Sequence, residues 1–431
     1  MFGTDGIRGR FGESPLTAEK IYELGQNLAK CAKKHGGAIF IGRDTRLSSD
    51  FILMQLSSGI MSLGVDVVDG GIMPTPLTAM FGQQLSECQL ALIIQITASH
   101  NPFHDNGLKF MWGDGEKWLD ADQRSFMSEY SAVQPVGQIV GRFFKAKETL
   151  PDLLFGCYKQ DMLAGQRVVV DAANGAYSLL AEPLFRYLGA DVVMIGANPD
   201  GRNINSGVGS TCPDAVRQKV LDENADMGIA VDGDGDRITM VTASGKILDG
   251  DDILWIVLNH QIQQGEQVSS IVITPMSNQG LVDACSMLGI KTEMVPVGDH
   301  HILGRLKETG QRYGAEPSGH VIDRCHGKTC DGLYMAVQVM LAQRATSGTL
   351  DAMVLGNRYA QVKCQVAYAT DQKDRISAFV DSEDWQQEGS RVSVRLSGTE
   401  PVVRIMVESS NAEKAKDVAS EISKRVEAFI T

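Results

Sequence analysis

The segment FRYLGADVVMIG, residues 185–196, carries the pattern that decides the fold. It reads as the last turns of a helix ending in Leu-Gly, then a short β-rich run, then another glycine. Glycine suits the end of a helix because that position takes a positive φ. The same pattern occurs in MSLGVDVVDGG (61–71) and CSMLGIKTEMVPVG (285–298). The chain therefore contains a weak internal repeat, with chance recurrence of Leu-Gly as the alternative.

Each copy of the repeat follows another β-rich run. These runs are AIFIG (38–42), RVVVDAANG (167–175) and SIVITP (270–275). A strand, a helix and a second strand in that order predict an α/β unit with a mainly parallel sheet. Three such units are therefore expected along the first three quarters of the chain.

The C-terminal part of the chain follows a different pattern. From about Tyr359, the alternating runs AQVKCQVAYAT, SVRLSG and VVRIMVES predict strands, and Asn411 is expected to cap an amphipathic C-terminal helix. We therefore expect three similar α/β domains with mixed, mainly parallel sheets, plus a smaller C-terminal α+β domain, around a central cleft. The expected domains span residues 1–150, 151–246, 247–355 and 356–431.

Composition and charge argue against several classes of protein. Of the 431 residues, 43% are apolar and 22% are charged, which is typical of a soluble globular protein. A net charge of −13 argues against nucleic acid or an anionic membrane as the main partner. The sequence shows no signal peptide and no apolar run of about 18 residues. The eight cysteines are scattered without a CxxC pair, which indicates reduced thiols and a cytoplasmic protein.

The segment VDGDGDR (231–237) alternates aspartate with glycine. An extended backbone turns Asp232, Asp234 and Asp236 to one face, and three carboxylates suit Mg²⁺ or Ca²⁺. An EF-hand loop is not expected, because its sixth position would be Arg237 instead of glycine. A turn with solvated aspartates is the alternative. Mutual repulsion of the carboxylates favours the metal site.

The segment RLSGTEPVVR (395–404) combines arginines with hydroxyl groups and a glycine. Such a loop can hold a phosphate through guanidinium groups, hydroxyls and free backbone N–H groups. The residues concerned are Arg395, Ser397, Gly398, Thr399 and Arg404. An ordinary hairpin turn is the alternative.

Two further segments are weaker on their own. GAEPSGH (314–320) offers Glu316, Ser318 and His320, a mixture of donors and acceptors that suits sugar hydroxyls. The opening FGTDGIRGR contains Arg8 and reads equally well as a packed β-turn. In IGRDTR, Asp44 stands between two arginines, and a structural ion-pair cluster is the favoured interpretation.

The segment TASHNP (97–102) places Ser99 directly after an apolar, strand-like run. A hydrolase is not favoured, because the segment is not a G-x-S-x-G nucleophile elbow. The carboxyl end of a strand is the usual ligand edge of an open α/β sheet. Together the segments describe a serine that carries a phosphoryl group, a cation beside it, and a clamp for a second phosphate.

Four motifs occur in the order and at the spacing of the α-D-phosphohexomutases: TASHNP, DGDGDR, GAEPSGH and RLSGTEPVVR. The chain resembles that family from residue 2 almost to its end. The resemblance implies that Ser99 is phosphorylated. It also implies that Asp232, Asp234 and Asp236 hold one Mg²⁺ together with that phosphate. The implied enzyme is an isomerase, an intramolecular phosphotransferase of carbohydrate metabolism.

The resemblance also implies roles for other residues. Arg8, Lys109 and Arg237 would surround the transferring group, and Lys109 and His320 are candidates for proton transfer. The implied sugar-binding and phosphate-binding residues are Glu316, Ser318, Arg395, Ser397, Gly398, Thr399 and Arg404. In VGDHH, His300 is expected to contact the ligand alone, because adjacent residues on a strand point in opposite directions.

The segments FGTDGIRGR and NPFHDNGLKF, and the GDH after the third repeat, most resemble bacterial members that act on amino sugars. The implied reaction interconverts hexosamine 6-phosphate and 1-phosphate, with glucosamine phosphate expected, through a 1,6-bisphosphate that also serves as activator. Pro317 and the pair His300–His301 depart from the amino-sugar pattern.

Alternatives follow from those departures. They are a phosphomannomutase or phosphoglucomutase and, outside the class, a magnesium-dependent sugar phosphatase or an inactive sugar-phosphate binding protein. The expected partner is a small sugar phosphate, and neither nucleic acid nor membrane is expected to bind. The resemblance is consistent with a homodimer.

Overall fold

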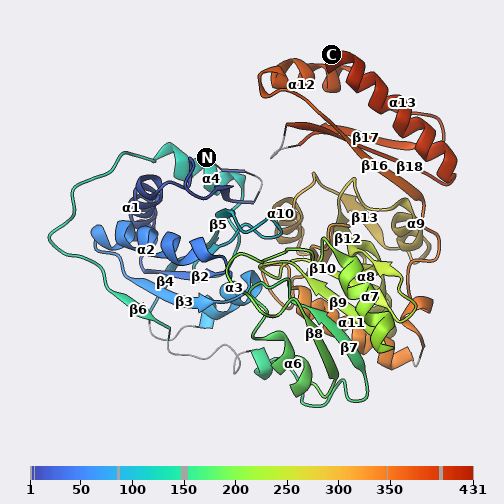
Figure 1. Ribbon diagram of the computed structural model, residues 1–431, viewed down its shortest axis with the longest axis horizontal. Coiled ribbons are helices and arrows are strands. Elements are labelled where there is room, and N and C mark those ends of the chain that lie inside the picture. Colours follow the sequence, from blue (N-terminus) through green and yellow to red (C-terminus); the bar gives the residue numbers. More distant parts are fainter. Residues whose placement is uncertain are drawn as a thin grey trace.

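The computed structural model describes residues 2–3, 5–84, 88–146, 154–346, 348–397 and 401–430 (Figure 1). These residues form four sheets, three of mixed direction and one antiparallel. The expected class, three α/β domains followed by a smaller α+β domain, is confirmed. The domain limits expected from the sequence stay predictions. None of the described helices is long and apolar enough to cross a membrane.

Domain I is built on a six-stranded sheet with helices on both sides (Figure 1). Its strands, in spatial order, are β1 (Ile7–Arg10), β5 (Asp105–Trp112), β4 (Leu90–Ile96), β2 (Ala38–Arg43), β3 (Val67–Ile72) and β6 (Phe143–Lys145). Its helices are α1 (Ala18–His35), α2 (Leu47–Ser62), α3 (Thr75–Gln84) and α4 (Asp120–Ser128). The expected N-cap of α1 is confirmed, because the Thr17 side chain accepts a hydrogen bond from the N–H of Lys20.

Domains II and III repeat the same plan with fewer strands. The domain II sheet runs β11 (Ile247–Leu248), β10 (Ile238–Thr242), β9 (Met227–Val231), β7 (Arg167–Asp171) and β8 (Asp191–Ile195), with α6 (Ala181–Tyr187) and α7 (Pro213–Glu223). The domain III sheet runs β13 (Lys291–Met294), β12 (Ser270–Ile273), β14 (Tyr313–Ala315) and β15 (Val321–Asp323). Its helices are α8 (Gly250–Gln263), α9 (Gln279–Met287), α10 (Asp299–Thr309) and α11 (Gly332–Thr346).

The internal repeat is confirmed at the level of backbone geometry. In each copy the two predicted strands pair in parallel, as β2 with β3, β7 with β8, and β12 with β13. The glycines that follow the repeated leucines, Gly64, Gly189 and Gly289, have φ values of 79°, 85° and 73°. A side chain is strained in this region, so glycine ends each helix at low cost.

The three sheets share one strand order. In each, a third parallel strand lies beside the first strand of the repeat, and the chain then turns back into an antiparallel fourth strand. These turns connect β4 to β5, β9 to β10, and β14 to β15. The motifs TASHNP, DGDGDR and EPSGH occupy these three equivalent turns. The repeat therefore places all three motifs at corresponding corners of their domains.

Domains II and III share one apolar core. Helix α8 contacts β10 of domain II and also β14 and β15 of domain III, and α11 contacts β9 and β10. Ile256, Met240, Tyr313 and Ala336, which come from both domains, are fully buried in this core. The loops DGDGDR of domain II and EPSGH of domain III are therefore held in fixed relative positions by one close-packed core.

Domain IV is an antiparallel sheet of β16 (Ala360–Ala367), β18 (Val402–Ser409) and β17 (Arg391–Leu396), covered on one face by α12 (Lys373–Ser382) and α13 (Ala412–Ile430) (Figure 1). Asn411 caps α13 as expected, because its side-chain oxygen accepts from the N–H groups of Glu413 and Lys414. The domain contacts domain III through Arg391, which donates to the carbonyl oxygen of Pro275 at 2.7 Å.

Candidate active site

Ser99 lies fully buried at the end of β4 and faces the aspartates of domain II. Its Oγ donates a hydrogen bond of 2.5 Å to Asp232 Oδ2. The backbone of Ser99 has a φ of 53°, a conformation that residues other than glycine adopt rarely and that is concentrated at functional sites. The predicted meeting of position 99 with the aspartate loop, 133 residues away, is thus found in the structure.

The turn that carries Ser99 is held by a buried ion pair. Arg46 Nε lies 2.8 Å from Asp44 Oδ2, and both side chains are completely buried. Arg46 also donates to the carbonyl oxygen of Ser99 at 2.9 Å, while Asp44 accepts from Thr97 Oγ1 at 2.8 Å. The expected ion-pair cluster is confirmed for Asp44 and Arg46, but Arg43 pairs with Asp50 and Asp69 instead.

Asp232, Asp234 and Asp236 converge as the alternation of aspartate and glycine predicted. Each offers a carboxylate oxygen within 4.8 Å of the others, and all three are buried. Asp234 Oδ1 and Asp236 Oδ1 are buried without a hydrogen-bond partner among the described residues. Burial and the charge of Asp236 raise the pKa of Asp234 to about 7. The unpartnered Asp234 Oδ1 and the convergence of three carboxylates fit a hard divalent cation such as Mg²⁺.

Lys109, on β5, lies against the same carboxylates. Its Nζ is 2.7 Å from Asp234 Oδ2 and 2.5 Å from Asp236 Oδ2, and its side chain is 2% exposed. Burial alone would lower the pKa of Lys109, but Asp234 and Asp236 outweigh it and raise the pKa well above its ordinary value. Asp5, which also pairs with Arg8, lies 3.4 Å from this ammonium group.

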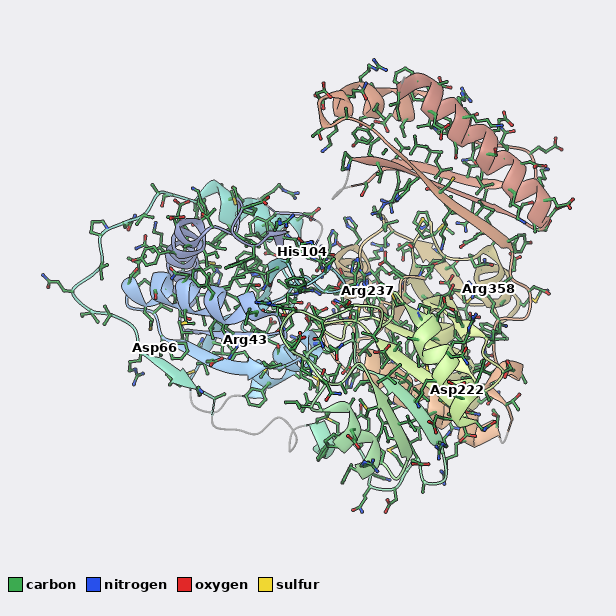
Figure 2. The ribbon with its side chains drawn as sticks, viewed as in Figure 1. Arg43, Asp66, His104, Asp222, Arg237 and Arg358 are labelled. Atoms are coloured by element: carbon green, nitrogen blue, oxygen red, sulfur yellow. The ribbon has the colours of Figure 1, made fainter. Side chains whose placement is uncertain are left out.

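Arg237 and His320 bring domains II and III together at the site. Arg237 Nε is 3.2 Å from His320 Nε2, and Figure 2 shows Arg237 where domain I meets the rest of the molecule. His320 Nε2 is 3.4 Å from Asp236 Oδ1, and Nδ1 is 3.2 Å from Glu316 Oε2. Burial and Arg237 lower the pKa of His320, but the two carboxylates outweigh them and raise it to about 10. Two cationic groups therefore meet here, an arrangement that a bound anion would stabilise.

Glu316 lies between His320 and the start of α10. Its Oε1 accepts from the N–H of Gly298 at 2.8 Å, and its Oε2 lies 3.1 Å from Ser318 Oγ. Burial alone would raise the pKa of Glu316, but His320 outweighs it and lowers the pKa to about 2. Ser318 is exposed, whereas Glu316 is buried. The loop therefore leaves Ser318 exposed, while a hydrogen bond to the buried Glu316 carboxylate holds its hydroxyl in place.

Lys117 forms an ionic bridge that no sequence motif predicts. Its buried ammonium group lies 2.7 Å from Asp299 Oδ2 of domain III and also pairs with Asp5. Asp5 belongs to the opening segment and Asp299 to the GDH segment, so both lay in motifs already singled out. Lys117 therefore connects Asp299 of domain III to Asp5. Asp5 in turn pairs with Arg8 and Lys109.

His300 and His301 are on a helix, not on a strand as expected. They occupy the first turn of α10, and their ring centroids are 3.9 Å apart. The assumption that they point in opposite directions is therefore wrong. His300 is buried beside Asp120 of domain I, and its contact with a ligand stays a prediction.

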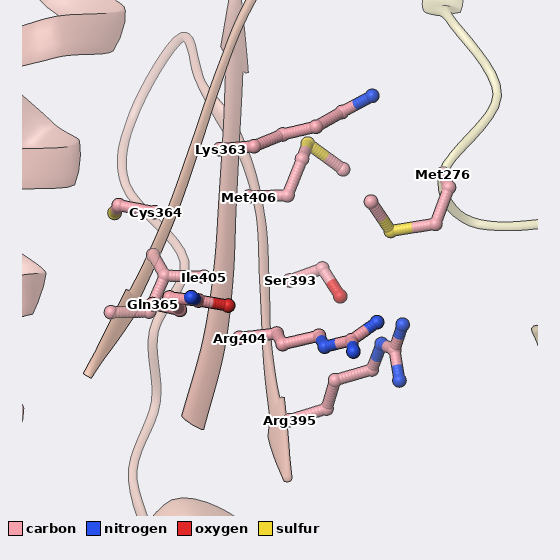
Figure 3. A pocket seen from close by; sticks show the side chains of 9 residues that line it. All are labelled: Met276, Lys363, Cys364, Gln365, Ser393, Arg395, Arg404, Ile405 and Met406. Atoms are coloured by element: carbon pink, nitrogen blue, oxygen red, sulfur yellow. The ribbon is translucent and has the colours of Figure 1, made fainter. Parts of the chain in front are cut away.

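Arg395 and Arg404 lie opposite each other on β17 and β18. Figure 3 shows their guanidinium groups side by side. Both residues line a cavity of about 280 Å³, which Met276 of domain III also lines. Burial and the charge of Arg404 lower the pKa of Arg395. Two adjacent like charges favour an anionic ligand. Ser397 is buried next to them, while Gly398 and Thr399 lie outside the described residues.

Comparison with known proteins identifies a family for the chain. Four models of the phosphoglucomutase/phosphomannomutase family match the chain: the α/β/α domains I, II and III at residues 1–135, 152–245 and 249–359, and the C-terminal domain at residues 363–425. A phosphoglucosamine mutase from Aeromonas salmonicida is 38% identical, covering 99% of this chain and 98% of its own. One from Chromohalobacter salexigens is 37% identical over 94% of both chains.

Solved structures share the fold. A phosphoglucomutase/phosphomannomutase family protein from Burkholderia thailandensis has a TM-score of 0.80 and 24% identity, covering 99% of this chain and 97% of its own. An Aspergillus fumigatus N-acetylphosphoglucosamine mutase, solved with GlcNAc-6P and magnesium, has a TM-score of 0.67 and 15% identity, covering 100% and 96%. The full-length matches show that the chain belongs to the phosphoglucomutase/phosphomannomutase family of α-D-phosphohexomutases.

Proposed function

We propose that this phosphohexomutase interconverts glucosamine 6-phosphate and glucosamine 1-phosphate through a phosphorylated Ser99. The observation that carries the proposal is the contact of Ser99 Oγ with Asp232, 2.5 Å away, at the edge of three convergent buried aspartates. The substrate follows from the relatives named phosphoglucosamine mutase, which match almost the whole chain.

In the proposed reaction, the bond between Ser99 Oγ and phosphorus breaks while a sugar hydroxyl oxygen bonds to the same phosphorus. A protonated group of the enzyme donates its proton to Ser99 Oγ, which ends as a hydroxyl, and the same group takes up the proton of the attacking sugar hydroxyl, so that no net proton is gained or lost. Asp232, Asp234 and Asp236 would hold the Mg²⁺, which neutralises charge on the phosphoryl group and on Ser99 Oγ. Arg8 would add a guanidinium group to the same region.

Lys109 and His320 are the proposed proton carriers. Both have a pKa raised above its ordinary value by neighbouring carboxylates, so both are protonated near neutral pH. Such a group is suited to donate a proton to the oxygen that leaves phosphorus and, once deprotonated, to accept the proton of the attacking hydroxyl in the same transfer. Arg237, next to His320, would bind the oxygens of the transferring phosphoryl group.

The non-reacting phosphate is proposed to bind Arg395 and Arg404, with Ser397, Gly398 and Thr399 as further donors. Because these groups lie in domain IV, the phosphate would be held away from Ser99 while the sugar spans the distance. Glu316 and Ser318 would bind sugar hydroxyls between the two phosphates. Turning the bisphosphate end for end then presents its other phosphoryl group to Ser99.

Replacing Ser99 with alanine tests the reaction. We expect Ser99→Ala to abolish mutase turnover while leaving the fold unchanged, and the exposed Ser58→Ala on α2 to retain full activity. Release of inorganic phosphate without formation of the isomer would establish a phosphatase instead. Substantial mutase activity in Ser99→Ala would refute the phosphoserine.

The sugar is tested separately, by comparing turnover of glucosamine 6-phosphate, mannose 6-phosphate and glucose 6-phosphate. Pro317 and His300–His301 depart from the amino-sugar pattern, which keeps a phosphomannomutase or phosphoglucomutase as the alternative. Preference for glucosamine 6-phosphate supports the proposal, and preference for either neutral sugar contradicts it. A cytoplasmic location and a homodimer stay predictions.

A further inference from the structure

Asp120, His300 and His301 form a second cluster of potential metal ligands, distinct from the three aspartates of the active site. Each offers one potential ligand atom, and these atoms lie within 4.8 Å of one another. Asp120 begins α4 of domain I, while the two histidines occupy the first turn of α10 in domain III. Successive helical residues are about 100° apart around the axis, so adjacent side chains can approach one ligand more closely than on a strand.

His300 lacks the hydrogen bonds that a buried imidazole normally makes. The residue is 3% exposed, and its Nδ1 has no hydrogen-bond partner among the described residues. Its Nε2 lies 3.6 Å from Asp120 Oδ1, which is too far for a hydrogen bond. Two ligands at about 2.0–2.2 Å from one tetrahedral ion are separated by roughly 3.3–3.6 Å. The separation of His300 Nε2 from Asp120 Oδ1 falls at the upper end of that range, and the potential ligand atoms of all three residues lie within 4.8 Å of one another.

A neighbouring contact already holds the two segments together. Lys117, three residues before Asp120, pairs with Asp299, one residue before His300. The donors are thus positioned across the domain boundary without a metal ion. The Asp120 side chain is 52% exposed, which leaves a path for an ion to enter and for water to complete its coordination.

We propose that Asp120, His300 and His301 bind a transition-metal ion of the Zn²⁺ class, which joins domain I to domain III. Two imidazoles and one carboxylate suit Zn²⁺, Co²⁺ or Ni²⁺, whereas Mg²⁺ prefers oxygen donors such as the aspartates of the active site. The ion fixes the start of α10, next to Gly298, whose N–H holds Glu316. The site is separate from the catalytic reaction and does not depend on its substrate.

Cobalt binding to the full-length protein tests the proposal. Metal-free protein is saturated with Mg²⁺ to occupy the aspartates and then titrated with Co²⁺, which has visible absorption bands that report nitrogen ligands and low coordination. We expect one Co²⁺ per chain, displaced by Zn²⁺. We expect His301→Gln and Asp120→Asn each to weaken binding by about 100-fold or more, since even indirect supports of metal sites contribute 10–100-fold. The exposed His104→Gln serves as the matched control and should bind normally.

Thermal unfolding gives a second readout of the same site. Because a ligand that binds only the folded state stabilises it, Zn²⁺ should raise the unfolding midpoint of the wild type and of His104→Gln, but not of Asp120→Asn. Asp120 is exposed, so its variant is expected to fold. Absence of Co²⁺ binding in the presence of Mg²⁺ overturns the proposal. So does unchanged affinity in both Asp120→Asn and His301→Gln, which would assign the ion to the active site.

Discussion

Removing the ammonium group of Lys117 should destabilise the protein strongly, because it leaves a buried carboxylate unpaired. Lys117→Met removes the ammonium group and keeps an unbranched apolar side chain that is one heavy atom shorter. Lys117 Nζ lies 2.8 and 2.7 Å from the two oxygens of Asp299, and the side chains of both residues are less than a tenth exposed. Breaking a buried ion pair by removing one partner costs about 3–5 kcal/mol.

The structure indicates the lower end of that range. Asp5, the other partner of Lys117, keeps its contacts with Arg8 and Lys109. Asp299 has no other ion-pair partner among the described residues, so the loss falls mainly on this one carboxylate. We therefore expect Lys117→Met to lower the free energy of unfolding by about 3 kcal/mol.

Urea unfolding followed by tryptophan fluorescence measures this loss, since Trp118 is buried next to Lys117 in the chain. The double variant Lys117→Met/Asp299→Asn should be more stable than Lys117→Met alone, because it no longer buries an unpaired carboxylate at position 299. Lys328→Met, which breaks only contacts at a partly exposed lysine, should cost less than about 1 kcal/mol. A loss below about 1 kcal/mol in Lys117→Met, or additive losses in the double variant, would refute the reasoning.

Three further predictions concern binding, pH and backbone conformation. Arg395→Ala should raise KM roughly 10- to 100-fold, the equivalent of a charge-assisted hydrogen bond of about 1.5–3 kcal/mol; unchanged KM would place the phosphate clamp elsewhere. Burial and Asp249 raise the pKa of Asp251 to about 8. The free energy of unfolding should therefore fall as pH rises from about 4 to about 8. Asp251→Asn should flatten that slope when urea unfolding is measured as a function of pH. Gly319→Ala should destabilise by about 1–3 kcal/mol from backbone strain alone, because φ is 98° and an added Cβ would lie 2.4 Å from a backbone oxygen of β10. Gly356 has open space around it, so the control Gly356→Ala should not lose stability in this way. Equal stability of the two variants would contradict the predicted backbone strain at Gly319.

The repeat and the site motifs could be predicted because each depends on a few consecutive residues. A helix that ends in Leu-Gly, and a turn such as DGDGDR, carry their conformation and chemistry within one segment. The repeat also explains why the motifs meet. Equivalent turns of similar domains lie at corresponding corners of their sheets, so Ser99 and Asp232 approach each other although they are far apart in sequence.

The parts that could not be predicted depend on contacts between distant segments. Nothing near Lys117 in the sequence indicates that Asp299, 182 residues later, is its partner. The shared core of domains II and III has the same origin, because apolar periodicity shows which face of α8 is buried but not which sheet covers it. The strand geometry assumed for His300 and His301 fails because α10 begins directly after Gly298, a boundary that the adjacent histidines do not reveal.

The central claim, that Ser99 accepts the phosphoryl group beside the three aspartates, is tested most directly by mass spectrometry. Dephosphorylated wild type, Ser99→Ala and Asp234→Asn are each incubated with glucosamine 1,6-bisphosphate and Mg²⁺. The account predicts one added phosphoryl group on the wild-type peptide that contains Ser99, none on Ser99→Ala, and much slower addition in Asp234→Asn. Active wild type that carries its phosphoryl group on any other residue would contradict the account.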